Sequence, residues 1–379
     1  MTAELVFNNA MLVLRDRVMR GHAVCRGGAI AELGEGPTAV PSVDLEGDLL
    51  LPGLVELHTD NLEHHVAPRP KVRWPMGAAL LAHDAQIAAA GITTVLDALA
   101  VVDRGDSPVR GTMLADATSA IAQAREAELL RADHLIHLRC EVSYGVVVRD
   151  SEALVDNPLV RLVSLMDHTP GQRQFTSVEQ YYVYYKGKFG YSDAEMVELI
   201  AKRQADQQLY SDANRRRLAA LCRERGLPLA SHDDATAEHV EESLDLGMTM
   251  AEFPTTPEAA RLAHDRGMAV IMGGPNVVRG ASHSGNVSAR TLAAAGSLDI
   301  LSSDYVPSSL LHGAFLLHEQ QGMALPDAVA MVSATPARAL GLDDRGEIAV
   351  GRRADLVRAR AVEGMPVVRQ VWRGGIRVA

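Results

Sequence analysis

Aromatic residues and cysteines are scarce in this chain, with 4% Phe, Trp and Tyr and three cysteines among 379 residues. Cys25, Cys140 and Cys222 are far apart and form no Cys-x-x-Cys pair, which excludes a disulfide scaffold and a thiolate zinc knuckle. No stretch approaches the roughly 20 apolar residues of a membrane-spanning helix. The N-terminal sequence MTAELVFNNAMLVLRDR lacks the basic start and unbroken apolar core of a signal peptide. We therefore expect a cytoplasmic protein without a membrane partner.

Positive charge is also in short supply. The chain has 37 Lys and Arg against 48 Asp and Glu, and its formal net charge is −11. This balance disfavours nucleic acid and anionic membranes as partners. The length allows one large domain with an appendage or two ordinary domains, and 47% hydrophobic residues suffice for a sizeable core. Histidine is plentiful, since there are 14, and several follow directly after short apolar runs.

The middle of the chain, residues 52–339, alternates strand-like apolar runs with helix-period segments. The runs span residues 54–60, 92–99, 134–143, 160–169, 227–234, 248–255, 268–276 and 298–306. Several intervening helical segments end at Gly, which suits a left-handed helix C-terminus. Eight such alternations predict a (β/α)₈ barrel of the TIM type. A doubly wound open sheet is the alternative, but its usual Gly-rich first turn is missing here.

The two ends of the chain have a different pattern. Residues 1–51 and 340–379 contain short apolar segments bounded by Gly, Pro, Asn or Asp, as strands joined by tight turns are. Two β-rich ends that flank one long middle are most simply paired into a single sheet or sandwich. We therefore predict a small β-sandwich domain built from both termini, beside a catalytic barrel of residues 52–339.

Histidines and carboxylates lie where the predicted barrel strands end, which is where the active sites of such barrels form. His58 and Asp60 are two residues apart and therefore share one face of a strand. The ends of other runs carry Glu141, Asp167, His168, His232, Asp233 and Asp304, and run six carries Glu252. Side chains of these types that point to a common axis can bind metal.

Their number favours two divalent ions, which need a bridging carboxylate and two or three further ligands each. We expect His58, Asp60 and Asp304 to hold the buried ion, and His168 and His232 to hold the outer ion, with Glu141 between them. Asp304 is then placed to accept the proton of the attacking water. The competing interpretation is structural, because a single His or Asp at a strand end is more often a loop or cap residue.

Other histidines are given structural roles. Residues in helix-like segments are interpreted as surface or helix-face residues: His83, His239, His264, His312 and His318. His134 and His137 lie lower on the third run, where a hydrogen-bonded core histidine is the better interpretation.

Two sequence motifs resemble the amidohydrolase superfamily. Residues 51–58, LPGLVELH, are similar to its first-strand signature. Residues 334–342, ATPARALGL, followed by GEI at 346–348 and GRRADLV at 351–357, are similar to its exit from the barrel into a β-rich domain. The resemblance covers essentially the whole chain in the same order. It implies a metal-dependent barrel with a small β-domain.

Three longer stretches resemble the PhnM family, which acts in bacterial phosphonate breakdown by the carbon–phosphorus lyase pathway. They are HTDNLEHH at 58–65 with PRPKVRWP at 68–75, GPNVVRGASHSGN at 274–286, and SSDYVPSSL at 302–310. The resemblance implies hydrolysis of α-D-ribose 1-methylphosphonate 5-triphosphate to the 5-phosphate and diphosphate.

The chain departs from the wider superfamily in two ways. Its first motif is His-x-Asp, and no lysine lies where a carbamylated bridge is expected, so Glu141 is the substitute. Zinc is favoured, and manganese or iron also suits such oxygen-rich ligands.

A triphosphate also needs cations or N–H donors around its phosphates. The candidates lie in predicted loops: Lys71, Arg73, Lys186, Lys188, Asn276, Arg279 and His283. Residues 181–191 contain five of the eight tyrosines and two of these lysines. We interpret this stretch as a lid, against the alternatives of an amphipathic helix that covers apolar surface and a nucleic-acid stacking platform.

Two rival functions stay open. One is hydrolysis of a cyclic amide or an amine C–N bond on the same barrel, and the other is a metal-free scaffold that acts by assembly. The expected partner is a small ribose triphosphate, and the sequence leaves open whether the chain forms a homo-oligomer.

Overall fold

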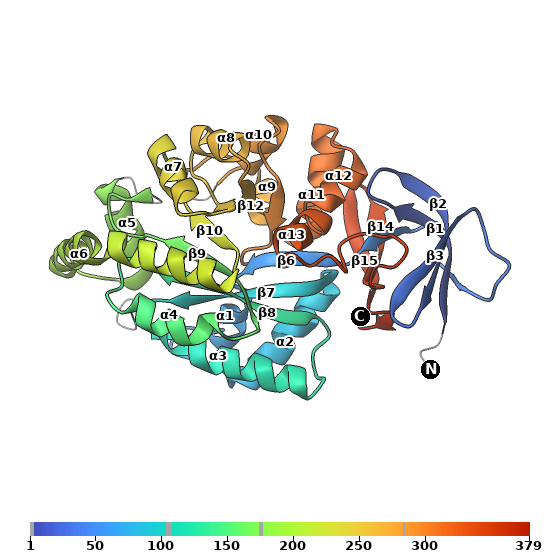
Figure 1. Ribbon diagram of the computed structural model, residues 1–379, viewed down its shortest axis with the longest axis horizontal. Coiled ribbons are helices and arrows are strands. Elements are labelled where there is room, and N and C mark those ends of the chain that lie inside the picture. The colour runs from blue at the N-terminus through green and yellow to red at the C-terminus, as the bar shows by residue number, and fades with distance from the viewer. Residues whose placement is uncertain (1–3, 104–107, 174–176, 283–284) are drawn as a thin grey trace.

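The computed structural model describes residues 4–103, 108–173, 177–282 and 285–379 (Figure 1). Eight strands pair side by side in chain order, each parallel to the next, as one sheet. They are β6 (Leu54–Thr59), β7 (Ile92–Val101), β8 (Asp133–Glu141), β9 (Val160–Met166), β10 (Leu229–His232), β11 (Met250–Glu252), β12 (Ala269–Gly273) and β13 (Ile300–Ser302). A parallel bridge between Thr59 and Asp304 links the first strand to the end of the last. All eight predicted runs are therefore confirmed as the strands of a nearly closed barrel.

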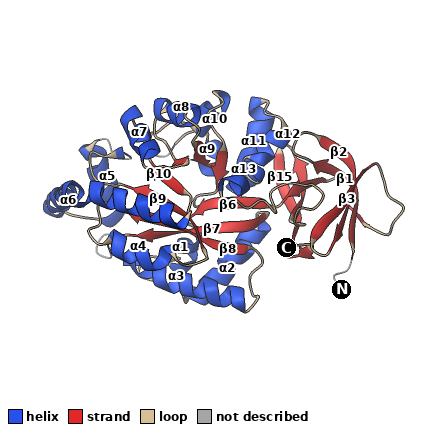
Figure 2. Cartoon of the chain, viewed as in Figure 1, coloured by secondary structure: helices blue, strands red, loops and turns tan. Residues whose placement is uncertain are grey.

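Helices surround this barrel, as Figure 2 shows in blue around the red strands. Those of the barrel's first half are α1 (Asn61–Val66), α2 (Met76–Ala89), α3 (Pro108–Glu126), α4 (Val147–Val155), α5 (Val178–Phe189) and α6 (Asp193–Arg225). Those of the second half are α7 (Ala237–Asp245), α8 (Pro257–Asp265), α9 (Gly274–Arg279), α10 (Ala289–Ala294), α11 (Ser309–Gln321), α12 (Leu325–Ala330) and α13 (Ala334–Ala339). Among the described residues, no helix is both long and apolar enough to cross a membrane.

The interior of the barrel is apolar at one end and polar at the other. Inward-facing residues near the strand starts, among them Val55, Leu135, Met250 and Ile300, form one buried cluster. Ala337 of α13 belongs to the same cluster and closes this end of the barrel. The strand C-termini carry buried His, Arg and Glu side chains instead. This division leaves the C-terminal end of the barrel for chemistry, as is general for such folds.

The two ends of the chain meet in a second eight-stranded sheet, at the right of Figure 1. It contains β1 (Leu5–Val13), β2 (Val18–Arg26), β3 (Ala29–Glu35), β4 (Val43–Asp44), β5 (Leu49–Pro52), β14 (Leu356–Val362), β15 (Met365–Arg373) and β16 (Ile376–Arg377). Strand β5 pairs antiparallel with β14, which joins the N-terminal and C-terminal strands. Phe7 packs edge-to-face on Trp372 with ring centroids 4.7 Å apart, so both ends share one core. The predicted sheet from both termini is thus confirmed, while the residues at which the domains divide stay a prediction.

Gly53 makes the junction between the two sheets possible. Its N–H donates to the Asp355 carbonyl at 2.7 Å, where the first barrel strand begins. A Cβ at this position would lie 2.3 Å from Thr93 Oγ1 and 2.8 Å from Asp355 Cβ. No side chain fits in that space. The glycine of the first-strand motif is therefore required by the close packing of the backbone at the start of β6 against Thr93 and Asp355.

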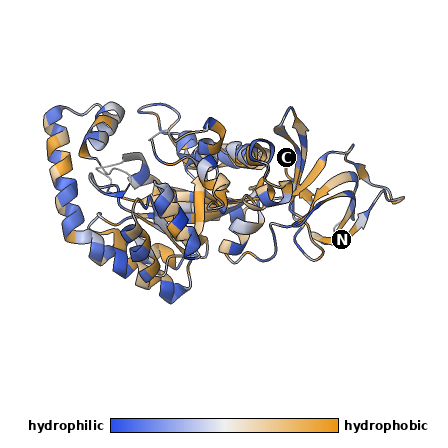
Figure 3. Ribbon diagram, turned by 90° about the horizontal axis from the view of Figure 1, so that it is seen from above, coloured by the Kyte–Doolittle hydropathy of each residue, from blue (hydrophilic) through white to orange (hydrophobic). Residues whose placement is uncertain are grey.

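The opposite end of the molecule is formed by α6, a helix of 33 residues that begins at a Ser192–Glu195 capping box and ends before Gly226. Figure 3 shows this helix at the left, with mixed hydrophilic and hydrophobic residues along its length, while the barrel strands are largely hydrophobic. A separate small cluster, centred on buried Tyr181 and Met196, packs α5 against α6. The tyrosine-rich stretch is therefore a helix with its own small core beside the barrel.

Candidate metal centre

One group of ligand atoms lies at the ends of β9 and β10. His168, His232 and Asp233 bring one ligand atom each to within 4.8 Å of one another. Asp233 Oδ2 lies 3.4 Å from His232 Nε2 and 3.8 Å from His168 Nε2. Within the described residues this buried oxygen has no hydrogen-bond donor. A buried acceptor without a donor, facing two imidazole nitrogens, fits a bound cation, so these residues suit a divalent metal ion. We call them the outer cluster.

The other ring nitrogens of both histidines contact carboxylates. His168 Nδ1 lies 2.7 Å from Glu141 Oε2, and His232 Nδ1 lies 2.6 Å from Glu252 Oε2. Because an ionised carboxylate only accepts, each Nδ1 carries the hydrogen and each Nε2 presents its lone pair to the cluster. This carboxylate–histidine pairing is the usual support of metal-ligating histidines in proteins.

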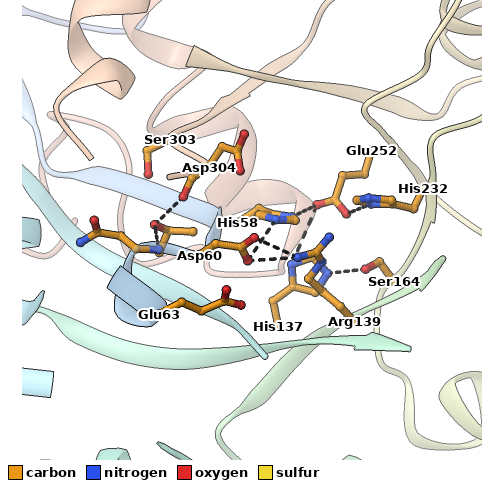
Figure 4. A network of polar contacts seen from close by, with 12 residues as sticks. His58, Asp60, Glu63, His137, Arg139, Ser164, His232, Glu252, Ser303 and Asp304 are labelled. Atoms are coloured by element: carbon orange, nitrogen blue, oxygen red, sulfur yellow. Dashed lines mark hydrogen bonds and ion pairs between the residues drawn. The ribbon is translucent and has the colours of Figure 1, made fainter. Parts of the chain in front are cut away.

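A second group, which we call the inner cluster, consists of His58, Asp60 and Asp304, again with ligand atoms within 4.8 Å. His58 Nδ1 donates to Glu252 Oε1 at 2.7 Å, and its Nε2 lies 3.8 Å from Asp60 Oδ1. Figure 4 shows Glu252 between His58 and His232. One buried carboxylate therefore fixes a histidine of each cluster. Burial alone would raise the pKa of Glu252, but the nearby histidines hold it well below its usual range.

Two arginines surround the carboxylate of Asp60. Arg139 Nη1 donates to both of its oxygens, at 3.0 and 3.1 Å, and Arg110 Nη2 donates to Oδ2 at 2.9 Å. Arg110 also pairs with Glu63 at 2.7 Å. Burial opposes ionisation of Asp60, yet Arg139 and Arg110 outweigh it and lower the pKa of this carboxyl below its ordinary range. Asp60 is therefore anionic, as a metal ligand has to be.

The backbone at the strand ends is conformationally unusual. Asp233, Phe253 and Asp304 have φ angles of 57°, 55° and 54°, a left-handed region that non-glycine residues rarely adopt. Asp304 is held there by its N–H, which donates to the His58 carbonyl at 3.0 Å, and by its carbonyl, which accepts from Asp60 N at 2.8 Å. Such conformations cluster at active sites, where the surrounding structure compensates their cost.

Glu56 supports the same region from inside the barrel. Its carboxylate accepts the backbone N–H groups of His58 at 2.7 Å and Ser303 at 2.5 Å, which ties β6 to the residues after β13. Burial raises the pKa of Glu56 to about 7 despite these hydrogen bonds. The carboxylate thus aligns the backbone beside two of the predicted ligands.

Both clusters open into one cavity of about 610 Å³, a size typical of small-molecule sites. Its walls include the rings of His64, Tyr185, Phe253 and Tyr305, together with residues of α9 and Ala281, Ser282 and Asn286 beyond that helix. Among the described residues, the charged groups of its lining are four carboxylates and three arginines: Asp60, Glu63, Asp233, Asp304, Arg110, Arg139 and Arg279.

The structure brings most of the predicted ligands together. The predicted ligands that line the cavity are His58, Asp60, His168, His232 and Asp304. Glu141 lies behind His168: its Oε2 contacts the ring, and its Oε1 accepts from the His168 N–H at 3.1 Å and the Ser143 hydroxyl at 3.0 Å. A bridge between two ions by Glu141 stays a prediction, as do the ligand roles of the other residues.

The predicted phosphate-binding residues are dispersed. Asn276 and Arg279 line the cavity. Lys71 and Arg73 are exposed outside the cavity lining, and Arg73 donates to Asp116 at 2.8 Å. Lys186 is exposed on α5 and pairs with Asp193. Lys188 belongs to α5, but its side chain lies outside the described part of the chain, as does the whole of His283.

The histidine assignments need one correction. His83 was expected at a surface or helix face, but it is fully buried, and its Nε2 contacts Asp97 at 2.8 Å. The apolar residues around it in α2 gave no sign that β7 supplies a buried carboxylate. His134 and His137 are buried and hydrogen-bonded, which confirms the core interpretation.

Two arginines of the site, Arg110 and Arg139, were not among the residues predicted from the sequence. Asp233 and Glu252 were named there as possible metal-binding residues at the predicted strands, but neither was assigned a role. A signal existed for Arg139, because it alternates with His137 and Glu141 on one strand and therefore faces the same way. Arg110 had no comparable signal, since only the packing of α3 brings it to Asp60.

A nearly closed parallel barrel with histidines and carboxylates at the strand C-termini defines a class of barrel proteins that can bind divalent metal ions at that end. The chain belongs to the amidohydrolase family, whose family model matches residues 78–379. It is 48% identical over 377 residues to the alpha-D-ribose 1-methylphosphonate 5-triphosphate diphosphatase of Escherichia coli strain K12, covering 99% of this chain and 100% of that protein. This similarity confirms the resemblance to the PhnM family.

Solved structures with the same fold extend over the whole chain. The N-isopropylammelide isopropylaminohydrolase of Burkholderia multivorans has a TM-score of 0.66 at 18% identity, covering 99% of this chain and 98% of that one. The N-acetyl-D-glucosamine-6-phosphate deacetylase of Mycobacterium smegmatis has a TM-score of 0.66 at 16% identity, covering 99% of both chains. At these identities the likeness concerns the fold, and it confirms the predicted barrel with its second sheet.

Proposed function

We propose that this chain hydrolyses α-D-ribose 1-methylphosphonate 5-triphosphate to α-D-ribose 1-methylphosphonate 5-phosphate and diphosphate. The observation that carries the proposal is the 48% identity to a diphosphatase of this substrate along 99% of the chain. The cavity supports it independently, because two ligand clusters and three arginines face one space large enough for a nucleotide-sized anion.

The charges of the cavity favour metal binding before substrate binding. Its four carboxylates exceed its three arginines by one negative charge when the histidines are neutral. A polyanion is repelled by such a surface, whereas one divalent ion reverses the sign. We propose one ion at each cluster, with zinc favoured over manganese or iron because of the mixed histidine and carboxylate ligands. Such ions polarise phosphoryl oxygens and lower the pKa of bound water.

Asp304 is the proposed proton acceptor. Its backbone is fixed at the mouth of the barrel by Asp60 and His58, and its side chain lines the cavity beside the inner cluster. Water attacks the α-phosphorus, its proton passes to the Asp304 carboxylate, and the α–β anhydride bond breaks. The bridging oxygen leaves with the diphosphate, so water supplies the oxygen that the ribose phosphate gains. The positive φ of Asp304 serves to keep the carboxylate at this point.

A second candidate is hydrolysis of a cyclic amide. A stretch of 85 residues is 39% identical to the dihydroorotase of Methanopyrus kandleri, although the match covers only 18% of this chain and 20% of that protein. The arginines of the cavity weigh against it, since a neutral ring with a single carboxylate does not need three guanidinium groups.

Parallel assays with zinc-loaded protein distinguish triphosphate hydrolysis from cyclic-amide hydrolysis. The ribose triphosphate and dihydroorotate are each supplied at saturating concentration, and diphosphate release and ring opening are measured with the metal content of the same sample. We expect diphosphate release and no ring opening. Ring opening without diphosphate release would overturn the proposal, and a protein that holds no divalent ion would favour the scaffold alternative.

We also propose that the enzyme acts in the cytoplasm. The three cysteines are unpaired and buried, and burial raises the pKa of the Cys222 thiol to about 12, which keeps it protonated. A protein whose thiols are neither paired nor reactive suits a reducing compartment.

A further inference from the structure

The arginines around Asp60 carry more hydrogen-bonding capacity than that carboxylate uses. A single carboxylate accepts three hydrogen bonds from Arg139 and Arg110 at 2.9 to 3.1 Å. The Nε atom of Arg139 is buried and has no hydrogen-bond partner within the described residues. A buried donor without an acceptor is costly, so a native site that retains one calls for an explanation.

The pair lines the cavity that the proposed substrate would enter. Arg139 projects from β8 beside the inner cluster with 6% of its side chain exposed, and Arg110 lies in the first turn of α3 with 28% exposed. Both line the cavity, and together with Arg279 they are the Lys and Arg residues of its described lining. The exposed cations predicted from the sequence, Arg73 and Lys186, lie outside it and pair with other carboxylates.

The chemistry of the pair is that of an anion receptor. The planar guanidinium group presents donors in a fork that matches two oxygens of a carboxylate or a phosphate. Here Asp60 and Glu63 hold the two forks in place before any ligand arrives, so little side-chain entropy is lost on binding. Each Asp60 oxygen has two lone pairs, so Asp60 can serve a metal ion while it still orients Arg139.

We propose that Arg110 and Arg139 form a phosphate-binding pair that takes the part of the triphosphate nearest the inner cluster. This inference rests on the proposed function and deepens it. The arginine pair replaces the exposed cations Arg73 and Lys186 as the principal phosphate contacts. It also explains why two arginines converge on a carboxylate that one arginine would neutralise.

Binding of inorganic triphosphate to the metal-loaded protein tests the pair. We expect Arg110→Met to weaken the affinity by roughly 10- to 100-fold, as for the loss of a charge-assisted hydrogen bond, with an unchanged metal content. Because Arg139 is buried, Arg139→Lys is the second variant, and it should recover part of the affinity that Arg139→Met loses. Arg216→Met is the matched control, because this exposed arginine on α6 pairs only with Asp212 in the described structure and should bind triphosphate normally.

Several results would overturn the proposal. One is unchanged triphosphate affinity in Arg110→Met. Another is weaker binding in Arg73→Met or Lys186→Met without an effect of Arg110→Met, which would assign the phosphates to these exposed cations. A third is weaker binding only in variants that also lose metal, which would make the arginines supports of Asp60.

The test of the arginine pair can fail or succeed independently of the test of the proposed function. If the wild-type protein releases no diphosphate from the ribose triphosphate but binds inorganic triphosphate in an Arg110-dependent way, the function fails and the pair stands. If the wild-type protein releases diphosphate and Arg110→Met leaves KM unchanged, the pair fails and the function stands.

Discussion

At the scale of single residues, Glu252 connects the two ligand clusters. Its two oxygens accept from His58 Nδ1 and His232 Nδ1 at 2.7 and 2.6 Å, and none of its side chain is exposed. A carboxylate in this position fixes the orientation of both rings and increases the basicity of their Nε2 atoms. Glu252 is thus a positioning residue for both clusters.

We expect Glu252→Gln to lower metal affinity by roughly 10- to 100-fold, because an amide cannot accept from both rings as a carboxylate does. Metal titration with a competing chelator measures this loss. The matched control is Glu258→Gln on the exposed side of α8, which should leave metal affinity unchanged. Equal metal affinity in the Glu252 variant would show that the two histidines orient themselves without this carboxylate.

Asp304 gives a second test at the residue scale. If it accepts the proton of the attacking water, Asp304→Asn should lower kcat by roughly 10²- to 10⁴-fold, since the amide cannot take up the proton. Because Asp304 also belongs to the inner cluster, the variant and the wild type are compared at equal metal content, and binding of inorganic triphosphate should then change much less. Steady-state kinetics together with a triphosphate titration separates the two, and a variant with nearly normal kcat would exclude Asp304 as the base.

At the scale of elements, a fully buried polar network joins β7, β8 and α2. Asp97 lies 2.8 Å from His83 Nε2 and 2.7 Å from His134 Nδ1. Burial alone would lower the pKa of His134, but the carboxylates of Asp97 and Asp84 outweigh it and raise the pKa to about 9. Asn61 connects His83 to the start of α1, one residue after Asp60. The network therefore fixes the elements behind the inner cluster.

The raised pKa of His134 makes the stability of the protein depend on pH. An unfolded histidine has a pKa near 6.5, so the stabilisation by charged His134 is complete below about pH 6.5 and is lost as pH rises through about 9. We expect His134→Gln to be less stable than the wild type at pH 6, and the difference to shrink by pH 10. Denaturant unfolding across this range measures it, and a difference that does not depend on pH would contradict a charged His134.

The strands could be predicted from the sequence, but the contacts between helices and strands could not. Residues 54–60 and 92–99 were recognised as strands because short apolar runs bounded by turn residues reflect burial on both faces. The same period-two pattern placed His58 beside Asp60. It could not place Arg110 or the buried partner of His83, because those contacts join α3 to Asp60, the residue after β6, and α2 to β7 through packing that no local pattern records.

At the scale of the whole molecule, Asp133 links the barrel to the second sheet. It lies at the start of β8 and pairs with Arg345 at 2.8 Å, Arg353 at 2.5 Å and Arg373 at 3.2 Å. Burial opposes ionisation, yet the arginines lower the pKa of this carboxyl below its ordinary value. Three segments of the C-terminal region therefore depend on one barrel residue.

We expect Asp133→Asn to lower the free energy of unfolding by about 1–3 kcal/mol, because three partly buried arginines lose their shared counter-charge. Metal content should not change, since Asp133 lies at the opposite end of β8 from Glu141. Urea unfolding and metal analysis of the same samples check both statements. An unaltered midpoint would show that the two sheets hold together through their apolar contacts.

The net charge of the whole molecule differs from the charge of the cavity lining. The net charge of −11 describes the molecule as a whole, but the described cavity lining is nearly balanced, with one carboxylate more than arginines. The sequence predicted cations near the phosphates and placed them largely on loops. Arg110 and Arg139 come instead from a helix and a barrel strand, which the distribution of charge along the chain does not reveal.

Phosphorus NMR of the metal-loaded protein with α-D-ribose 1-methylphosphonate 5-triphosphate in ¹⁸O-labelled water tests the central claim most directly. Attack on the α-phosphorus predicts diphosphate as the first product, with the label found only in the ribose 5-phosphate. Stepwise release of single phosphates, or label in the diphosphate, would contradict the account.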